Sequence, residues 1–333
     1  MTLTNYWWLL IWLVVAGGLL SIMVPKRQVQ VLGKTEYRWS WPAAIFLICP
    51  YAVWCMNRKN FGDTEVYRQT FYSIPTSLGQ LSAYLTENTK DQGFSIFTGV
   101  LKTIIGNNDK MFFLIIAIFQ LLCIVYFFRN YSNDYLMCMF MFVASTDYLS
   151  WMFNGMRQFI AVCIVLLAFG LVLKKKYIPA IAIILLASTI HGSALLMLPL
   201  IFVVQGKAWN KRTLLMIFGV GLAIMFMGQF TSILDSLLAE TQYSDLVTNE
   251  IWINDDGTNI LRVLFYSIPM ILSLVGKRFV DEENSPVINM CVNCSICTSV
   301  IYALSAASSG IYLGRLPIYT TLPGYRSEEH TSE

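Results

Sequence analysis

An arginine separates two long apolar runs near the middle of the chain. The segment Asn154-Gly155-Met156-Arg157-Gln158 lies between the apolar residues 135–153 and 159–173. On insertion scales, a charged side chain in a membrane helix costs about 2.5–3.5 kcal/mol at mid-bilayer and less near an edge. Arg157 therefore needs a partner or a purpose. Arginine is suited to bind phosphate, because it stays charged and offers paired N–H donors.

Further residues that can take part in such chemistry lie near the ends of other apolar runs. They are Arg58, Asp63, Asp91, His191 and Arg315. A carboxylate or a neutral histidine can act as base toward a hydroxyl. Each residue also has an ordinary interpretation. Arg58 can hold a helix end at the headgroups, Asp63 can cap a helix through Tyr72, Asp91 can be a simple loop residue, and His191 can be a satisfied core polar group.

The composition places these residues in a membrane. The chain has 333 residues, 56% hydrophobic and 13% charged, with a mean hydropathy of +0.58, whereas soluble domains carry roughly 25% charged residues. Several apolar runs are long enough to cross a hydrocarbon core of about 30 Å. We expect an all-α, polytopic transmembrane helical protein whose first run, from Tyr6, is a retained helix. The net charge of +3 is modest and says nothing about nucleic acid, and we expect no nucleic-acid partner.

Hydropathy and loop charge together predict the topology. We expect one transmembrane domain over residues 1–325 with about 9–11 membrane helices. The expected segments are 6–24, 41–56, 111–128, 135–153, 159–173, a hairpin at 178–204, 214–230, 260–275, 287–304 and a last helix from residue 316. Short loops rich in Lys and Arg stay cytoplasmic, which places the N-terminus outside. All the residues named above then share the outer face.

Two long polar segments are external in this topology, residues 57–109 and 231–259. The first carries Phe94, Phe97, Leu101, Ile104 and Ile105 at helical spacing, which predicts a short amphipathic helix on the outer leaflet. The second is acidic and is a candidate surface for acceptor recognition. In the hairpin His191 lies at the tip; the alternative, one long tilted helix, would invert every later loop.

Two further segments need an interpretation. Cys291, Cys294 and Cys297 have metal-ligand spacing, but no fourth ligand is near, and small weakly polar residues at helix contacts explain them better. We therefore expect neither a metal nor a cofactor. Residues 326–333, which include His330, resemble the translation of a sequencing-adapter oligonucleotide. We interpret them as an artefactual tail on a truncated last helix.

A series of spaced motifs carries a family resemblance. The series is Arg58-x4-Asp63-Thr64-x2-Tyr67, Asp91-x-Gly93-Phe94, Asn154-x2-Arg157-Gln158, His191-x-Ser193-Ala194-Leu195 and Arg315-x3-Tyr319. Each motif alone is weak, but five in this order at helix edges are fairly specific. The chain resembles the EpsG family, Wzy-like polysaccharide polymerases of bacterial capsule and exopolysaccharide clusters, over residues 58–319.

The resemblance implies a multi-spanning fold related to the GT-C glycosyltransferases, in the bacterial cytoplasmic membrane. It implies joining of oligosaccharide units carried on undecaprenyl diphosphate at the outer face. The expected partners are this lipid-linked substrate, the bilayer and other membrane proteins of polysaccharide assembly. We expect catalytic roles for Arg157, His191, Asp63 and Asp91, and substrate-binding roles for Arg58, Arg315, Gln158, Tyr67 and Tyr319.

The division of labour within this set stays open at the level of sequence. Arg157, with Arg58 or Arg315, would bind the donor diphosphate, and Asp63, Asp91 or His191 would remove the acceptor proton. Two other functions use similar residues. A flippase for lipid-linked oligosaccharides would also use membrane arginines, but along a mid-membrane cavity. A membrane O-acyltransferase would use a catalytic histidine such as His191, but needs an acyl donor path from the cytoplasm.

Overall fold

The computed structural model forms two compact units. Unit 1 comprises Met1–Phe169 and Ile181–Ala194, and unit 2 comprises Gly170–Ala180 and Leu195–Glu333. The residues that the structure describes are 3–31, 34–87, 90–227, 229, 232–233, 236, 257–308, 310 and 313–329. Most of the predicted external segment 231–259 therefore lies outside the described residues.

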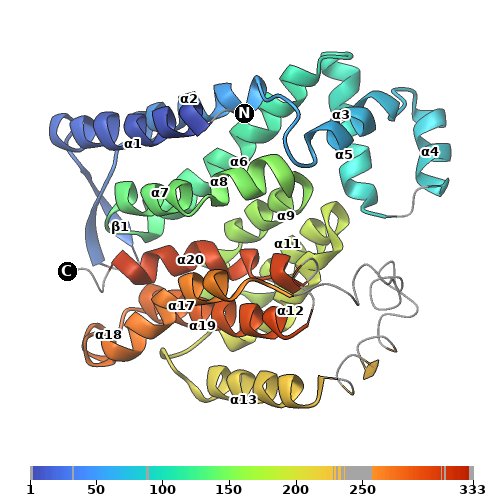
Figure 1. Ribbon diagram of the computed structural model, residues 1–333. Coiled ribbons are helices and arrows are strands. Elements are labelled where there is room, and N and C mark those ends of the chain that lie inside the picture. The colour runs from blue at the N-terminus through green and yellow to red at the C-terminus, as the bar shows by residue number, and fades with distance from the viewer. Residues whose placement is uncertain are drawn as a thin grey trace. The chain divides into compact units, whose positions relative to one another are not determined.

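Unit 1 contains the first helices of the chain and a small β-hairpin (Figure 1). Its elements are α1 (Leu3–Met23), β1 (Arg27–Val31), β2 (Lys34–Arg38), α2 (Trp41–Met56), α3 (Thr64–Ser73), α4 (Leu78–Glu87), α5 (Gln92–Ile105), α6 (Asp109–Tyr131), α7 (Tyr135–Ala144), α8 (Asp147–Leu149), the π-helix η1 (Ser150–Asn154) and α9 (Met156–Leu167). Two short helices, α10 (Phe169–Leu173) and α11 (Tyr177–Ile190), carry the chain from one unit to the other.

The membrane character predicted from composition is confirmed. Four helices are long and apolar enough to cross a membrane, and up to six spans result if each bent pair counts as one. The four are Asn5–Met23, Asp109–Tyr131, Met156–Leu173 and Pro286–Ala306. Three shorter apolar helices, Trp41–Met56, Tyr177–Ile190 and Gly192–Val203, accompany them. The chain is therefore an all-α multi-pass membrane protein, and the expected number of 9–11 spans stays a prediction.

The helix expected over residues 135–153 is broken, which corrects the sequence interpretation. After α7 the chain turns by 68° into α8 and η1, and Thr146 adopts a left-handed conformation with φ 68°. Hydroxyl and carboxylate side chains compete with the helix for backbone hydrogen bonds, and here Ser145 Oγ accepts from the Asp147 N–H at 3.4 Å. Asp147 then accepts from the Trp151 indole at 3.1 Å. A bent, widened turn thus leads into α9.

The segment after α1 forms a β-hairpin, whereas the sequence predicted only a basic cytoplasmic loop. β1 and β2 pair antiparallel with Arg27 opposite Arg38, as the alternation of polar and β-branched residues favours. Arg38 forms an ion pair with Glu36 and donates to Asn133 Oδ1 at 3.1 Å. The hairpin is thus fastened to the loop that follows α6.

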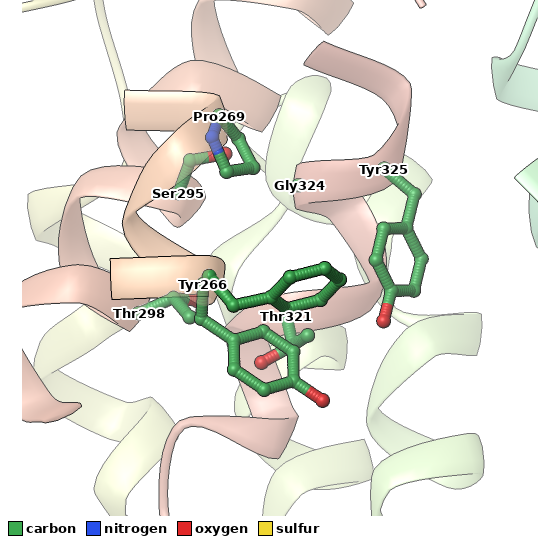
Figure 2. A pocket seen from close by; sticks show the side chains of 8 residues that line it. Tyr266, Pro269, Ser295, Thr298, Thr321, Gly324 and Tyr325 are labelled. Atoms are coloured by element: carbon green, nitrogen blue, oxygen red, sulfur yellow. The ribbon is translucent and has the colours of Figure 1, made fainter. Parts of the chain in front are cut away.

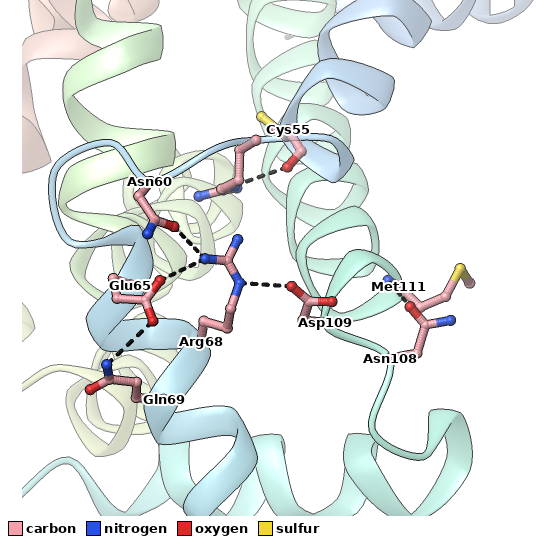
Figure 3. A network of polar contacts seen from close by, with 9 residues as sticks. Cys55, Asn60, Glu65, Arg68, Gln69, Asn108, Asp109 and Met111 are labelled. Carbon is pink, nitrogen blue, oxygen red and sulfur yellow. Dashed lines mark hydrogen bonds and ion pairs between the residues drawn. The ribbon is translucent and has the colours of Figure 1, made fainter.

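The first predicted external segment folds into α3, α4 and α5. The predicted amphipathic helix is present as α5, with Phe94 and Leu101 buried and Ile104 exposed. Figure 3 shows Arg68 of α3 reaching Asp109, at the start of α6, with Nε–Oδ2 at 2.8 Å. The same guanidinium bonds to Glu65 at 2.8 Å. This network fixes α3 against the start of α6.

Unit 2 is built around α19 (Pro286–Ala306), of which nearly every residue is buried. The other elements are the 3-10 helix η2 (Gly192–Leu196) at the boundary with unit 1, α12 (Met197–Val203), α13 (Lys211–Met225), α17 (Ile260–Val275), α18 (Lys277–Glu283), the 3-10 helix η3 (Leu313–Arg315) and α20 (Ile318–Glu329). Amide side chains of α19 fasten the loop before α13, since Asn289 accepts from the Ala208 N–H at 3.0 Å. Asn293 donates to Val204 O at the same distance.

The segment 178–204 reverses direction within the chain. The ring of Tyr177, at the start of α11, lies 5.0 Å from the ring of Phe202 near the end of α12. The Tyr177 hydroxyl also bonds to Gln205 Oε1 at 2.5 Å. One straight helix of this length would hold these residues roughly 40 Å apart at 1.5 Å per residue. His191 therefore lies at the turn between two antiparallel arms; whether that turn faces the outer side stays a prediction.

A small pocket lies within unit 2, between α17, α19 and α20. Figure 2 shows the ring of Tyr266 and the hydroxyls of Ser295, Thr298 and Thr321 around it. Its volume of about 10 Å³ holds about one water, and no charged residue lines it. The pocket is therefore too small for a sugar, and none of the predicted site residues lines it.

Candidate functional site

Arg157 lies in the first turn of α9, not in the loop that the sequence predicted. The π-helix η1 ends with a bond from the Gly155 N–H to Ser150 O at 3.1 Å, and α9 begins with a bond from the Phe159 N–H to Gly155 O at 2.9 Å. No acidic residue is present in the first turn of α9. The N-terminus of a helix carries partial positive charge, so an arginine there is electrostatically unfavourable unless an anion joins it.

Arg157 contacts two segments of unit 1, residues 91–94 and α3. Its Nε lies 3.2 Å from Asp91 Oδ2, and its guanidinium carbon lies 5.9 Å from the centre of the Phe94 ring. The Tyr67 hydroxyl accepts from the Arg157 backbone N–H at 3.4 Å. The Arg157 Nε–H is buried and not aligned with any acceptor among the described residues. The contact with Asp91 is thus an ion pair and not a directed hydrogen bond.

Asp91 immediately precedes α5 and adopts a left-handed conformation, with φ 49° and ψ 46°. Its Oδ1 accepts from the Gly192 N–H at 3.1 Å. Burial raises the pKa of the Asp91 carboxyl above its ordinary value, and the charge of Arg157 opposes this only in part. These contacts bring residues 91, 157 and 192 together within unit 1, and their shared place on the outer face stays a prediction.

Gly93 permits the close approach of α5 to the end of α11. A Cβ at this position would lie 2.7 Å from Thr189 O and 2.8 Å from its carbonyl carbon. These are backbone atoms, so a larger residue would push the start of α5 away and move Asp91 with it.

We expect Gly93→Ala to lower the free energy of unfolding by about 1–3 kcal/mol, the usual cost of overpacking. Thermal unfolding of the protein in lipid nanodiscs measures this. Gly79→Ala in α4 is the matched control, because a Cβ there would meet nothing within 4 Å. Equal melting temperatures for the two variants would contradict the tight contact at Gly93.

His191, Ser193 and Gln158 form a hydrogen-bonded chain in which Gln158 and Ser193 are buried and His191 is partly buried. Gln158 Nε2 donates to Ser193 Oγ at 3.3 Å, and Ser193 Oγ lies 2.7 Å from His191 Nδ1. The Ser193 backbone N–H also donates to His191 Nδ1 at 3.4 Å. Since Nδ1 accepts, the proton of the neutral ring is on Nε2. Nε2 of His191 is then a hydrogen-bond donor.

Arg58 is buried behind the start of α9, with 5% of its surface exposed. It donates to Cys55 O and to Met152 O, each at 2.9 Å, and its guanidinium lies over the rings of Phe113 and Phe153. Its Nη2 has no hydrogen-bond partner within the described residues. Arg58 thus adds positive charge to the η1–α9 junction without a carboxylate partner in that part of the chain.

Asp63 occupies the position before α3, as predicted, but its side chain makes no capping bond. Its backbone N–H donates to Asn154 Oδ1 at 3.1 Å. The preceding Gly62, at φ +53°, lies close to the same side chain. A Cβ added at Gly62 would lie 2.5 Å from Asn154 Oδ1. Asp63 is therefore held beside the end of η1 with its carboxylate unengaged by any described residue.

Arg315 and Tyr319 belong to unit 2. Arg315 is exposed at the end of η3, and Tyr319 is buried in α20. That these two residues share a face with Arg157 stays a prediction.

Some residues of this site were missed as individual candidates. These are Asn154, Phe94 and Ser193, each of which stands in one of the spaced motifs near a charged or titratable residue. The spacings Asn154-x2-Arg157 and His191-x-Ser193 were the signals that could have identified two of them. The bond between Asp91 and Gly192 spans 101 positions, and no local sequence pattern predicts it.

Comparison with known proteins supports one family. The EpsG family model matches residues 43–325, which include every predicted site residue. No curated protein matches the chain. No solved structure matches it either.

Proposed function

Because the chain belongs to the EpsG family, a Wzy-like polymerase family, we propose that it polymerises oligosaccharide repeat units carried on undecaprenyl diphosphate. The product is a capsular or exopolysaccharide, made on the outer face of the cytoplasmic membrane. Family membership indicates a polysaccharide polymerase-type function. The lipid-linked substrate, the cytoplasmic membrane and its outer face are part of the proposal.

The observation that carries the proposal is the position of Arg157 at the start of α9. The helix N-terminus, the Arg157 guanidinium and the buried Arg58 all favour an anion in the same region. Arg157 keeps 38% of its side-chain surface exposed although its Nε contacts Asp91. The rest of the guanidinium is thus available for a second anion, and a diphosphate fits its paired donors.

The transfer that we propose is a direct displacement at the sugar. A hydroxyl oxygen of the acceptor repeat unit attacks C1 of the donor sugar, and the bond from C1 to the diphosphate oxygen breaks. The electron pair leaves with undecaprenyl diphosphate, and the hydroxyl proton passes to a base. Fixed donors at the leaving oxygen stabilise the charge that develops there, which is typically the largest contribution to catalysis. Arg157 supplies such donors.

Asp63 is the base that the contacts favour. Both oxygens of Asp91 are engaged, by Arg157 and by Gly192, and His191 Nδ1 is engaged by Ser193. The Asp63 carboxylate has no such partner in the described part of the chain, while its backbone is tied to Asn154, three residues before Arg157. A free carboxylate beside the diphosphate subsite is placed to accept the proton.

The experiment that tests this function is reconstitution in lipid nanodiscs with an undecaprenyl-diphosphate-linked repeat unit. We expect a ladder of longer glycans and release of one undecaprenyl diphosphate for each unit joined. In cells that lack the protein, single repeat units are expected to remain on the lipid at the outer face. Units retained at the inner face would support a flippase instead, and full-length polymer without acyl groups would support an O-acyltransferase.

A further inference from the structure

The carboxylate of Asp91 bridges two segments that are distant in the sequence. Its Oδ2 lies 3.2 Å from Arg157 Nε in the first turn of α9. Its Oδ1 accepts at 3.1 Å from the Gly192 N–H, at the turn between α11 and η2. One side chain therefore sets the distance between the arginine and the segment that carries His191.

The local structure holds this carboxylate firmly. Asp91 adopts a left-handed conformation, which costs free energy for a residue other than glycine and persists where surrounding contacts determine it. Two residues later, Gly93 is in close contact with the Thr189 backbone. The side chain of Asp91 is 7% exposed, against 38% for Arg157. The Asp91 carboxylate thus contacts the buried side of the Arg157 guanidinium and leaves its solvent-exposed side accessible.

We infer that Asp91 is the resident counter-ion of the diphosphate subsite, a positioning residue that shares Arg157 with the incoming substrate. This inference rests on the proposed function. Its Oδ2 orients the guanidinium, its Oδ1 holds the 191–193 turn, and neither oxygen takes the acceptor proton. The role of Asp91 is thereby separated from that of Asp63.

The charged and titratable groups around Asp91 determine how it affects diphosphate binding to Arg157. Arg157 faces it from α9, Tyr67 comes from α3 to the Arg157 backbone, His191 is next to Gly192 at the turn, and Lys90 precedes it in the chain. A diphosphate on Arg157 adds negative charge close to a carboxylate, and like charges repel. Asp91 therefore weakens diphosphate binding while it improves the alignment of Arg157. Its removal is expected to change affinity and rate in opposite directions.

Asp91→Asn tests this opposition, because asparagine keeps an oxygen for the Gly192 N–H and loses the charge. With the full chain in nanodiscs, we expect the dissociation constant for geranyl diphosphate to fall about two- to fivefold, the range for a partly exposed ion pair. We expect kcat for polymerisation to fall at least about tenfold, since small misplacements of catalytic groups are costly. Asp281→Asn is the control: it removes the charge from an exposed ion pair with Lys277 and should change neither quantity.

Two results would overturn the inference. One is weaker diphosphate binding together with lower kcat, which indicates general structural damage. The other is a wild-type kcat. If Asp91→Asn does not fold, Asp91→Glu and Asp91→Gln repeat the comparison at equal length, and Gln must bind geranyl diphosphate more tightly than Glu. If the wild-type protein binds geranyl diphosphate but forms no polymer, the proposed function fails, while the order of affinities still decides the role of Asp91.

Discussion

Arg157→Ala is expected to slow polymerisation by about 100- to 1,000-fold, the usual loss when one fixed donor to a developing anion is removed. The physical reason is its place in the first turn of α9, where both the guanidinium and the helix N-terminus favour the leaving diphosphate. Release of undecaprenyl diphosphate in nanodiscs measures the rate. Arg157→Lys should fall between the wild type and the alanine variant, because it keeps the charge and loses the paired donors.

Two controls separate chemistry from folding at this position. Removing Arg157 leaves the buried Asp91 carboxylate without its cation, which destabilises a protein by itself. The double variant Arg157→Ala with Asp91→Asn removes that charge and should stay as inactive as the single variant. Arg278→Ala is the neutral reference, because Arg278 forms only an exposed pair with Glu282. Undiminished activity of Arg157→Ala would remove the role that we assign to this residue.

Asp63→Asn is expected to lower kcat by about 100- to 10,000-fold, the range for loss of a general base. The bond that places Asp63 runs from its backbone N–H to Asn154, so the substitution should leave the fold and the affinity for the donor unchanged. Single-turnover rates and the dissociation constant for geranyl diphosphate measure the two quantities separately. The expected pattern is a lost rate with retained binding.

Glu65→Gln is the matched control for Asp63. Glu65 lies two residues later, in the first turn of α3, and its carboxylate pairs with Arg68 at 2.8 Å. Partly exposed pairs of this kind contribute about 0–1 kcal/mol, so Glu65→Gln should polymerise nearly as fast as the wild type. A wild-type rate in Asp63→Asn would exclude Asp63 as the base and return the choice to Asp91 and His191.

The two aspartates among the three candidates for the base thus differ in their surroundings and not in their type. Asp63 and Asp91 both precede a helix of the same polar segment, residues 57–109. One carboxylate has no partner among the described residues, and the other is held by Arg157 and Gly192. His191 is oriented by Ser193. A proton acceptor needs a free lone pair in the substrate's reach, so these contacts decide which residue is tested first.

The sequence alone determined the membrane character, the family resemblance and several helix bounds. The bounds expected for residues 41–56 and 260–275 agree with α2 and α17, because hydropathy and capping are properties of neighbouring residues. The motif spacing also selected Arg157, Asp91 and His191, which the structure brings together within unit 1. The position of Asp63 before α3 was predicted for the same local reason.

Tertiary structure alone decided how these residues are used. The break at Thr146 moves Arg157 from a loop into the first turn of a helix, although the run over residues 135–153 is apolar enough for one continuous span. The burial of Arg58, the engagement of Asp91 and the bond from Gln158 to Ser193 depend on partners tens of positions away or more. Hydrophobic periodicity records which residues leave water or enter lipid, but not which polar groups meet. That pairing is set by packing between segments, such as the contact of Gly93 with Thr189, and it exists only once the chain has folded.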